Sequence, residues 1–331
     1  MAVIEVRDVS RSFLLRRRAS RLRRTSEVVH AVDALTFDVA AGEMVGYIGP
    51  NGAGKSTTVK MLTGILVPSG GRLTVAGFTP HAERTSLARH IGVVFGQRTT
   101  LWWDLPLRDS FELLRRIYRI PESRYRQNLA TFTELLELGR LLDTPVRQLS
   151  LGQRMRGDIA AALLHDPQIV YLDEPTIGLD VVSKARLRAF LRQANRDRGV
   201  TVLLTTHDLD DIEQLCSRVM VIDHGRLVFD GGLEGLHALG GARRTLVVDL
   251  VEPAEPISVS GADTVRVEGP RQWLTFAAES SAAPLVAAVA SSYDVADLSI
   301  LEPDIEDVIT RIYTSSPPGP TPPPLSERRR T

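Results

Sequence analysis

The sequence is poor in cysteine, since Cys216 is the single cysteine among 331 residues. One thiol excludes an internal disulfide framework and fits a reducing compartment. We expect Cys216 to be a small apolar residue buried on a helix rather than a catalytic or redox thiol.

The sequence also lacks a long apolar run and a net charge. The apolar stretches 159–164 and 283–290 are far shorter than the roughly 18 to 20 residues of a membrane-spanning helix. Forty basic residues balance forty acidic ones, so the overall charge gives no argument for binding nucleic acid or an anionic membrane. The N-terminus starts like a strand and carries no signal-peptide pattern. We therefore expect a cytoplasmic chain that reaches a membrane only through a partner.

The sequence contains an alternation of strand and helix patterns. Its length predicts two domains. The alternation extends over more than a hundred residues and predicts an α/β fold with a mostly parallel sheet covered on both faces. The predicted strands lie at 2–8, 31–39, 71–78, 169–175 and 200–208, the predicted helices at 106–142 and 183–197, and a closing hairpin at 220–231 around His224 and Gly225.

Between the first two predicted strands stands RRRASRLRR, residues 16–24, with six arginines. We interpret it as a solvated basic loop inserted between two strands. Contact with anionic lipid headgroups, or another interface of a basic patch, is the alternative.

The composition changes at LGGAR, residues 239–243, which we interpret as a linker. Beyond it, four strand patterns, a helix at 280–292 and a last helix at 304–313 predict a small α+β domain. The proline-rich tail 315–331 cannot bury a core, so we expect it to be disordered or polyproline-like. The expected domains are 1–240, 241–314 and this tail.

The segment GPNGAGKST matches the phosphate-binding pattern G-x-x-x-x-G-K-[ST] and lies between a strand and a helix, as the mechanism requires. Small residues let backbone amides surround phosphates, and the helix N-terminus adds a positive dipole. Lys55 would reach the terminal phosphates, and Ser56 would bind Mg²⁺. The expected nucleotide-binding residues here are Gly49, Pro50, Asn51, Gly52, Ala53, Gly54, Lys55, Ser56 and Thr57.

The segment IVYLDEP supplies the acids that such a site needs. Four apolar residues predict a buried strand whose end presents Asp173 to magnesium and Glu174 to the attacking water. Paired acids at a strand end are otherwise ordinary capping or loop residues.

Three further segments, LSLGQRMRGDIAAALLHDP (149–167), TIGLD (176–180) and TTHD (205–208), complete a set of five motifs in order. Together they resemble the nucleotide-binding subunit of ABC transporters over roughly residues 2–240. The wording of IGPNGAGKSTTVKMLTGIL, VFGQRTTLWWDLP and LSLGQRMR is most similar to ATPases of the daunorubicin-exporter type, particularly a bacterial subgroup linked to export of toxic organic compounds. The resemblance implies a P-loop nucleotide-binding domain with a RecA-like core, an antiparallel β subdomain and a helical subdomain at about 98–148.

The resemblance also implies roles for single residues. Phe13 would stack on adenine, with a plain core residue at a strand end as the alternative, and Gln97 would contact magnesium and water. His207 would hydrogen-bond the γ-phosphate, although a structural histidine is the default without these neighbours. Ser150, Gly152 and Gln153 would bind the ATP held by a second subunit, and Asp180 would lie at the dimer seam.

The signature segment departs from the usual LSGGQ, because Leu151 replaces glycine at its third position. A backbone amide remains there, so we expect phosphate binding through Ser150 and Gly152 to survive. The departure puts ATP affinity in doubt, and it adds apolar bulk near the dimer interface.

Trp102 and Trp103 stand side by side in QRTTLWWDL. In the family, this segment lies where a helix of the membrane partner docks, so the two rings would be apolar anchors, with Asp104, Arg98 and Arg108 as a polar rim. The alternative is that one ring packs inside the helical subdomain.

The resemblance implies ATP and Mg²⁺ as ligands, a dimer of such subunits, membrane-spanning permease partners and a position on the inner face of the cell membrane. An exporter ATPase for a hydrophobic drug, toxic compound or lipid-like molecule is the favoured function, with no nucleic acid expected. A non-transport ABC ATPase, an importer subunit and a simple P-loop kinase or GTPase are the alternatives. The C-terminal domain resembles an accessory extension that steadies or regulates the dimer.

Overall fold

A computed structural model describes residues 1–18, 24–96, 98–206, 208–239, 243–277 and 280–301. The chain divides into two compact units, Met1–Gly231 and Gly232–Thr331. Each unit has its own core and is described by itself. The domain limits expected from the sequence, 1–240 and 241–314, stay a prediction.

The first unit is built around a six-stranded sheet in the order β5-β6-β7-β3-β8-β9. The strands are β5 (Ile91–Phe95), β6 (Ile169–Asp173), β7 (Thr201–Thr205), β3 (Met44–Ile48), β8 (Arg218–Asp223) and β9 (Arg226–Gly232). The five strands from β5 to β8 are parallel. Every residue of β3 and β7 is buried, which is why these strands read as continuous apolar runs in the sequence. The predicted parallel sheet and the hairpin at His224 and Gly225 are confirmed.

A second, antiparallel sheet has the order β2-β1-β4, with β1 at Ala2–Arg18, β2 at Arg24–Ala40 and β4 at Gly70–Val75. The strands predicted at 2–8 and 31–39 are therefore too short. The predicted basic loop at 16–24 is wrong at both ends, because Arg16–Arg18 and Arg24 belong to paired strands. A strand rich in arginine lacks the apolar alternation by which a strand is recognised. Residues 19–23 lie outside the described residues.

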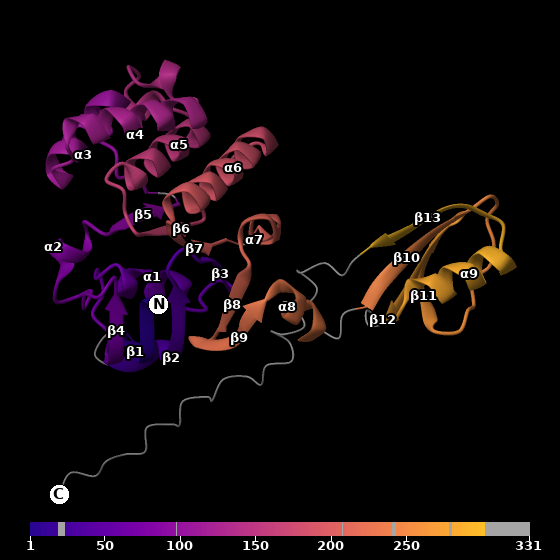
Figure 1. Cartoon of the computed structure of the whole chain (residues 1–331). Helices are drawn as coiled ribbons and strands as arrows, with labels where there is room; N and C mark the ends of the chain where they lie inside the picture. The colour runs from indigo at the N-terminus through magenta and orange to yellow at the C-terminus, as the bar shows by residue number, and fades with distance from the viewer. Residues whose placement is uncertain (19–23, 97, 207, 240–242, 278–279, 302–331) are drawn as a thin grey trace, which may run out of the picture. The chain divides into compact units, whose positions relative to one another are not determined.

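Helix α1 (Lys55–Leu62) packs between the two sheets, where Val59, Met61 and Leu62 join a core with Ile4 of β1 and Tyr47 of β3. Figure 1 shows α3, α4 and α5 grouped at the end of the unit away from β1, β2 and β4. The remaining helical elements are α2 (Arg84–Leu87), α3 (Leu107–Tyr118), α4 (Glu122–Leu135), η1 (Gly139–Leu141), η2 (Val146–Gln148), α5 (Leu151–Leu163), α6 (Val181–Arg198) and α7 (Leu209–Leu215). The predicted helices at 106–142 and 183–197 are confirmed as α3, α4 and α6.

The second unit holds a four-stranded antiparallel sheet in the order β11-β12-β10-β13. Its elements are α8 (Leu233–Leu239), β10 (Arg243–Leu250), β11 (Ala262–Glu268), β12 (Arg271–Ala277), α9 (Ala282–Ser292) and β13 (Val295–Leu301). Leu285 and Val289 of α9 pack on Leu246, Leu274 and Phe276 of the sheet. The small α+β unit is thus present, whereas α8 was not predicted. The predicted helix at 304–313 and the tail lie outside the described residues.

The structure also bears on membrane-spanning helices and on the single cysteine. Across the part of the chain that the structure describes, no helix combines the length and apolarity needed to cross a membrane. Cys216 is buried, with 5% of its surface exposed, and it follows α7 as the helix C-cap. Burial raises the pKa of its thiol to about 12. The expected burial is confirmed, but Cys216 lies just after the helix and not on it.

Candidate active site

The loop between β3 and α1 depends on glycine for its shape. Gly52 and Gly54 have φ angles of 87° and 110°, a region that favours glycine. A Cβ atom on Gly54 would lie 2.4 Å from the carbonyl oxygen of Ala31. The neighbouring Ala53 carbonyl accepts a hydrogen bond from the Gly225 amide at 2.9 Å. The turn of the β8–β9 hairpin therefore holds the loop in place.

Lys55 is the first residue of α1 and folds back over this loop. Its ammonium donates to the carbonyl oxygens of Gly49 at 2.5 Å and Pro50 at 3.1 Å. Burial lowers the pKa of Lys55, and the negative charges of Glu174 and Asp173 act against that shift. Lys55 and the two acids therefore lie close enough to influence one another electrostatically.

Asp173 and Glu174 stand at the carboxyl end of β6. The hydroxyl of Thr205, on the neighbouring strand β7, donates to Asp173 Oδ1 at 2.5 Å. The amide of Glu174 donates to the carbonyl oxygen of Thr205 at 2.9 Å. Glu174 has a φ angle of 56°, which is uncommon for a residue with a side chain and concentrates at functional sites. The backbone strain at Glu174 fits an active-site role.

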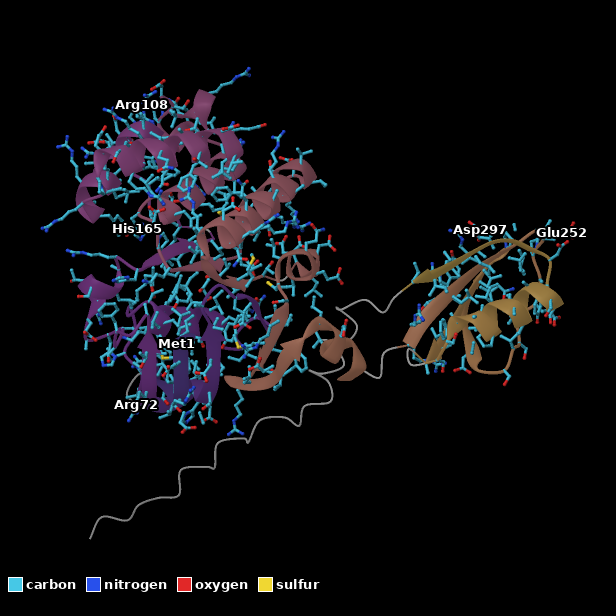
Figure 2. All side chains as sticks on the ribbon, viewed as in Figure 1. Met1, Arg72, Arg108, His165, Glu252 and Asp297 are labelled. Carbon is cyan, nitrogen blue, oxygen red and sulfur yellow. The ribbon has the colours of Figure 1, made fainter. Side chains whose placement is uncertain are left out.

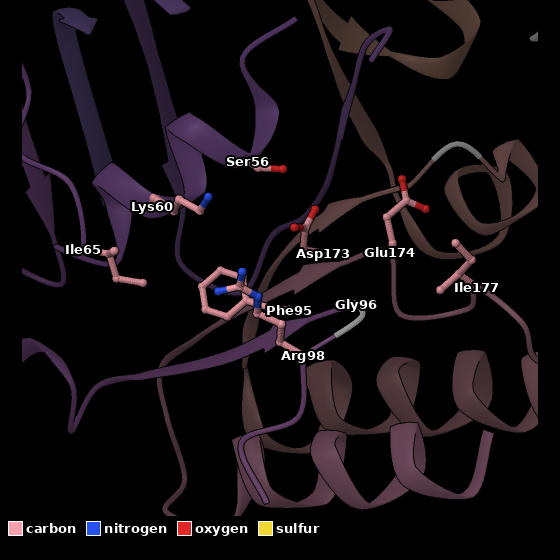
Figure 3. A pocket seen from close by; sticks show the side chains of 9 residues that line it. All are labelled: Ser56, Lys60, Ile65, Phe95, Gly96, Arg98, Asp173, Glu174 and Ile177. Atoms are coloured by element: carbon pink, nitrogen blue, oxygen red, sulfur yellow. The ribbon is translucent and has the colours of Figure 1, made fainter. Parts of the chain in front are cut away.

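A pocket of about 370 Å³ joins the start of α1 to these acids. Figure 3 shows that the Ser56 hydroxyl and the carboxylates of Asp173 and Glu174 face the same space. The described residues that line it are Ser56, Lys60, Ile65, Phe95, Gly96, Arg98, Asp173, Glu174 and Ile177. The structure thus brings Ser56, Asp173 and Glu174 together, and it adds Lys60, Phe95 and Arg98, which the sequence interpretation did not place here.

Gly96 is a site residue that the sequence interpretation missed. Its amide donates to the Asp173 carbonyl at 2.7 Å. A Cβ atom on Gly96 would lie 2.8 Å from that carbonyl oxygen and 3.2 Å from Glu174 Cβ. Glycine lets the end of β5 pass directly against the two acids. The signal was its position immediately before Gln97; Gln97 itself and His207 lie outside the described residues.

Comparison with known proteins identifies the family. Residues 32–177 match the family model of ABC transporters. An ABC transporter ATP-binding protein of Bacillus subtilis is 33% identical over 211 residues, which is 64% of this chain and 85% of that protein. The chain belongs to the ATP-binding proteins of ABC transporters. A daunorubicin/doxorubicin resistance ATP-binding protein of Streptomyces peucetius is 36% identical over 76% of this chain and 80% of its own length.

Solved structures of ABC ATP-binding cassettes have the same fold. An ATP-binding subunit of an ABC transporter superimposes with a TM-score of 0.62 at 27% identity, covering 71% of this chain and 92% of its own. A dimeric cassette in a post-hydrolysis state with ADP and phosphate bound has a TM-score of 0.61 at 26% identity, covering 70% of this chain and 98% of its own. The predicted P-loop nucleotide-binding fold and the resemblance to drug-exporter ATPases are confirmed.

The ABC signature segment opens α5 with a capping box. Ser150 Oγ accepts from the Gln153 amide at 3.2 Å, and Gln153 Oε1 accepts from the Ser150 amide at 2.9 Å. These reciprocal bonds fix the first turn of the helix. Ser150, Gly152 and Gln153 are not among the described residues that line the pocket around Ser56, and their role toward the ATP of a second subunit stays a prediction.

Leu151 packs against the segment TIGLD. A Cβ atom on Gly178, whose φ angle is 71°, would lie 2.5 Å from Leu151 Cδ2, and one on Gly152 would lie 3.0 Å from Leu179 Cδ2. Asp180 caps α6 by accepting from the amide and hydroxyl of Ser183 at 2.9 and 2.7 Å. These hydrogen bonds lower the pKa of Asp180. The two segments that the sequence assigned to the dimer seam therefore touch within one chain.

Phe13 lies on β1 opposite Val29. It is partly exposed, and the Arg11 guanidinium lies 4.7 Å above its ring centroid. One face of the ring is therefore covered by a cation, and its role toward adenine stays a prediction.

Asp158 of α5 anchors the segment that follows residue 97. Its Oδ1 atom accepts three hydrogen bonds, from the Thr99 hydroxyl at 2.8 Å, the Thr100 amide at 3.0 Å and the Thr100 hydroxyl at 3.3 Å. Asp158 is 5% exposed, and burial raises its pKa, with these bonds acting against the shift. The signature helix thus holds the residues after Gln97.

Trp102 and Trp103 follow this anchor, with 37% and 50% of their surfaces exposed. Both rings are therefore partly open to solvent, and the Arg154 guanidinium lies 5.6 Å from the Trp103 ring centroid. Asp104 pairs with Arg147 at 2.7 Å, a partner that the sequence interpretation did not find. Of the two predicted rim arginines, Arg108 (Figure 2) pairs with Asp143 at 2.9 Å.

A second pocket, of about 210 Å³, lies between α1, β5, α3 and α5. Thr100 lines it, as do His165 and Tyr118, whose rings stack with centroids 4.0 Å apart. Thr100, which lines this pocket, lies two residues before Trp102. One short segment therefore carries both a wall of the pocket and the exposed tryptophans.

Proposed function

We propose that the chain is the ATP-hydrolysing subunit of a bacterial ABC exporter and that it works as a pair with a separate membrane-spanning permease. The observation that carries the proposal is the pocket in which Ser56, at the start of the phosphate-loop helix, faces Asp173 and Glu174. Its residues supply the parts of phosphoryl transfer: an anion cradle, oxygen ligands for Mg²⁺ and a carboxylate base.

The residues present fit a magnesium ion. Mg²⁺ prefers oxygen ligands and takes one or two from the protein when it also binds phosphate oxygens. The Ser56 hydroxyl and the Asp173 carboxylate would hold it, with Asp173 oriented by Thr205. The ion supplies positive charge next to the transferred phosphoryl group.

Glu174 is the proposed general base. It accepts a proton from the attacking water as the new P–O bond forms and the bond between the γ-phosphorus and the bridging oxygen breaks, leaving ADP and phosphate. Lys55 and the loop amides stabilise the charge on the phosphoryl oxygens. Gln97 and His207 are assigned beside the γ-phosphate by family resemblance.

Two copies would complete each site. The segment with Ser150, Gly152 and Gln153 would close on the ATP bound by the other copy, with Asp180 at the seam. The dimeric cassette among the related structures supports this arrangement. The unit after residue 240 would steady or regulate the pair.

Transport direction and membrane attachment rest on the relatives. Their names include daunorubicin/doxorubicin resistance in Streptomyces peucetius and Nod factor export in Rhizobium, the latter 37% identical over 78% of its length. We infer export of a hydrophobic drug, a toxic compound or a lipid-like molecule. Trp102 and Trp103 would anchor a permease helix beside the pocket at Thr100, which places the chain on the inner face of the membrane.

The test of catalysis is Glu174→Gln in the purified chain. Loss of the base should lower the steady-state rate of ATP hydrolysis about a hundredfold to ten-thousandfold while ATP still binds. Glu213→Gln, an exposed carboxylate on α7, is the matched control and should hydrolyse ATP at the wild-type rate. Turnover of the Glu174 variant near wild type would refute the assignment.

The test of transport is co-purification from detergent-solubilised membranes. The wild type should recover a multi-spanning protein that Trp102→Ala/Trp103→Ala loses, while Trp273→Ala, in the second unit, should retain it. Recovery of soluble partners alone, equally by all three forms, would indicate a non-transport ATPase.

A further inference from the structure

The β1–β2 hairpin continues past the sheet to which it belongs. The described pairs between β4 and β1 run from Ile4 to Ser10. Beyond them, β1 and β2 pair with each other from Phe13–Val29 out to Arg18–Arg24. We call Phe13–Arg18 together with Arg24–Val29 the basic ribbon. A ribbon of two strands is marginally stable in water, so a surface that covers it would stabilise it.

One face of the basic ribbon combines apolar and basic positions and has no acid. Successive residues of a strand alternate between its two faces, and the register is regular from Ser12 onward. The exposed fractions of Leu14 and Val28 are 57% and 49%. From the base outward, this face carries the pairs Leu14–Val28, Arg16–Ser26 and Arg18–Arg24.

Basic residues outnumber acids in the sequence of the ribbon, which has four arginines and one glutamate. Arg18 and Arg24 are directly opposite each other, and like charges in opposite positions destabilise a pair of strands. Glu27, the one acid of the ribbon, is opposite Leu15 and belongs to the other face. The whole chain has as many acids as bases, so the ribbon is a local concentration of charge. Such a face is complementary to an anionic surface.

We propose that this face of the basic ribbon binds the anionic phospholipid surface of a membrane. Guanidinium groups bind phosphate through paired hydrogen bonds, and Leu14 and Val28 would enter the boundary between headgroups and acyl chains. Nucleic acid fits less well, because single strands bind through stacked aromatic side chains. The aromatic residue of the ribbon, Phe13, belongs to the opposite face and lies under Arg11. This attachment is separate from ATP hydrolysis and from the permease.

The test is flotation of the full-length chain, purified without any membrane partner, with two kinds of vesicle. The wild type should float with vesicles of phosphatidylcholine and phosphatidylglycerol, and much less with phosphatidylcholine alone. Each arginine near an anionic surface strengthens binding by about fivefold. Arg16→Ser/Arg18→Ser/Arg24→Ser should therefore bind at least about tenfold more weakly, and added salt should weaken the wild type in the same direction.

Two further variants separate charge from apolar contact. Arg72→Ser/Arg89→Ser/Arg140→Ser removes the same charge from exposed positions outside the ribbon (Arg72 is marked in Figure 2) and should bind like the wild type. Leu14→Ser/Val28→Ser should weaken binding to the anionic vesicles. The remaining binding should depend on salt as strongly as that of the wild type. ATP hydrolysis, measured on every variant, should be unchanged, which keeps this test independent of the proposed function.

Three results would overturn the proposal. The first is equal flotation of the wild type and the ribbon triple variant. The second is equal flotation of the wild type with neutral and anionic vesicles. The third is ribbon-dependent retention of an RNA oligonucleotide without flotation, which would assign the ribbon to nucleic acid.

Discussion

The hydrogen bonds of Asp158 join the signature helix to the segment after residue 97. We predict that Asp158→Ala destabilises the first unit, whereas Asp158→Asn does not. The contrast depends on one atom, because all three hydrogen bonds end on Oδ1. An asparagine in the same rotamer keeps an oxygen acceptor at that position, and an alanine removes it.

The magnitude follows from the number of bonds. A hydrogen bond contributes about 0.5–1.5 kcal/mol net, and the donors of Thr99 and Thr100 are not buried, so water can replace the lost acceptor. Three donors therefore give a loss of about 3 kcal/mol for Asp158→Ala. For a unit of this size, that corresponds to a fall in melting temperature of roughly 6–12 °C.

The pH dependence has a definite sign. Burial raises the pKa of Asp158 above its usual 3.8, so the folded state holds this proton more tightly than the unfolded state. The ionised carboxylate therefore costs stability above its folded pKa, and this cost disappears as the pH falls below 3.8. Asp158→Asn should equal or exceed the wild type at neutral pH, with the difference shrinking as the solution is acidified.

Thermal unfolding of the three proteins across this pH range checks the reasoning. Asp143→Ala and Asp143→Asn, at a carboxylate with 80% exposure that pairs only across the surface with Arg108, are matched controls that should change little. Equal damage by alanine and asparagine at position 158 would show that charge, not the acceptor atom, holds the segment. No effect of either would show that the segment has another anchor.

Three more substitutions test other contacts. Gly96→Ala forces a methyl group against the Asp173 carbonyl and should cost about 1–3 kcal/mol and lower ATP turnover, while Gly139→Ala, whose nearest neighbour would lie at 3.8 Å, should do neither. Arg188→Met removes the ion pair, at 2.6 Å, of the fully buried Asp211 carboxylate. The free energy of unfolding, measured by chemical denaturation, should fall by about 3–5 kcal/mol. Adding Asp211→Asn should restore part of it. Gly178→Ala should destabilise the wild-type chain more than a chain that already carries Leu151→Gly. The leucine side chain that the new methyl group meets is absent from the second chain. Additive effects of the two substitutions in a double-mutant cycle would contradict this contact.

The inner strands β3, β6 and β7 of the central sheet could be predicted because they are buried on both faces. Residues 44–48, 169–173 and 201–205 are mainly apolar runs of strand length, and the first two are followed directly by glycine and by an acid. The extension of β1 and β2 could not be predicted, because its outer pairs are arginine, serine and threonine, which leave no apolar pattern. Helix α5 carries the signature motif, but its sequence shows no amphipathic helix pattern, because seven of its last nine residues are small or apolar and are buried together with Asp158.

The candidate site also contains residues that the sequence predicts and residues that it does not. Lys55, Ser56, Asp173 and Glu174 could be predicted because each lies in a short motif with a fixed spacing. Gly96 and Thr205 were not predicted, because their contacts with the acids come from the parallel pairing of β5, β6 and β7. For Gly96 the sequence offers one signal, its place before Gln97, and that signal does not reveal the contact. The link from Asp158 to Thr99 joins residues 59 apart in the sequence and follows from the packing of α5 on the loop after β5.

The Leu151 substitution shows how a departure from a motif can be absorbed locally. The residue keeps its place in the first turn of α5, where the capping box of Ser150 and Gln153 sets the backbone. Its side chain turns to Gly178, where a Cβ atom would have no room. The glycine of TIGLD therefore leaves room for the leucine of the signature segment. Because Asp180 and the start of α6 follow Gly178 directly, any displacement of Leu151 during closure of a dimer would press on the segment that carries Asp180. In this chain, the two parts of the proposed seam are joined by direct side-chain packing.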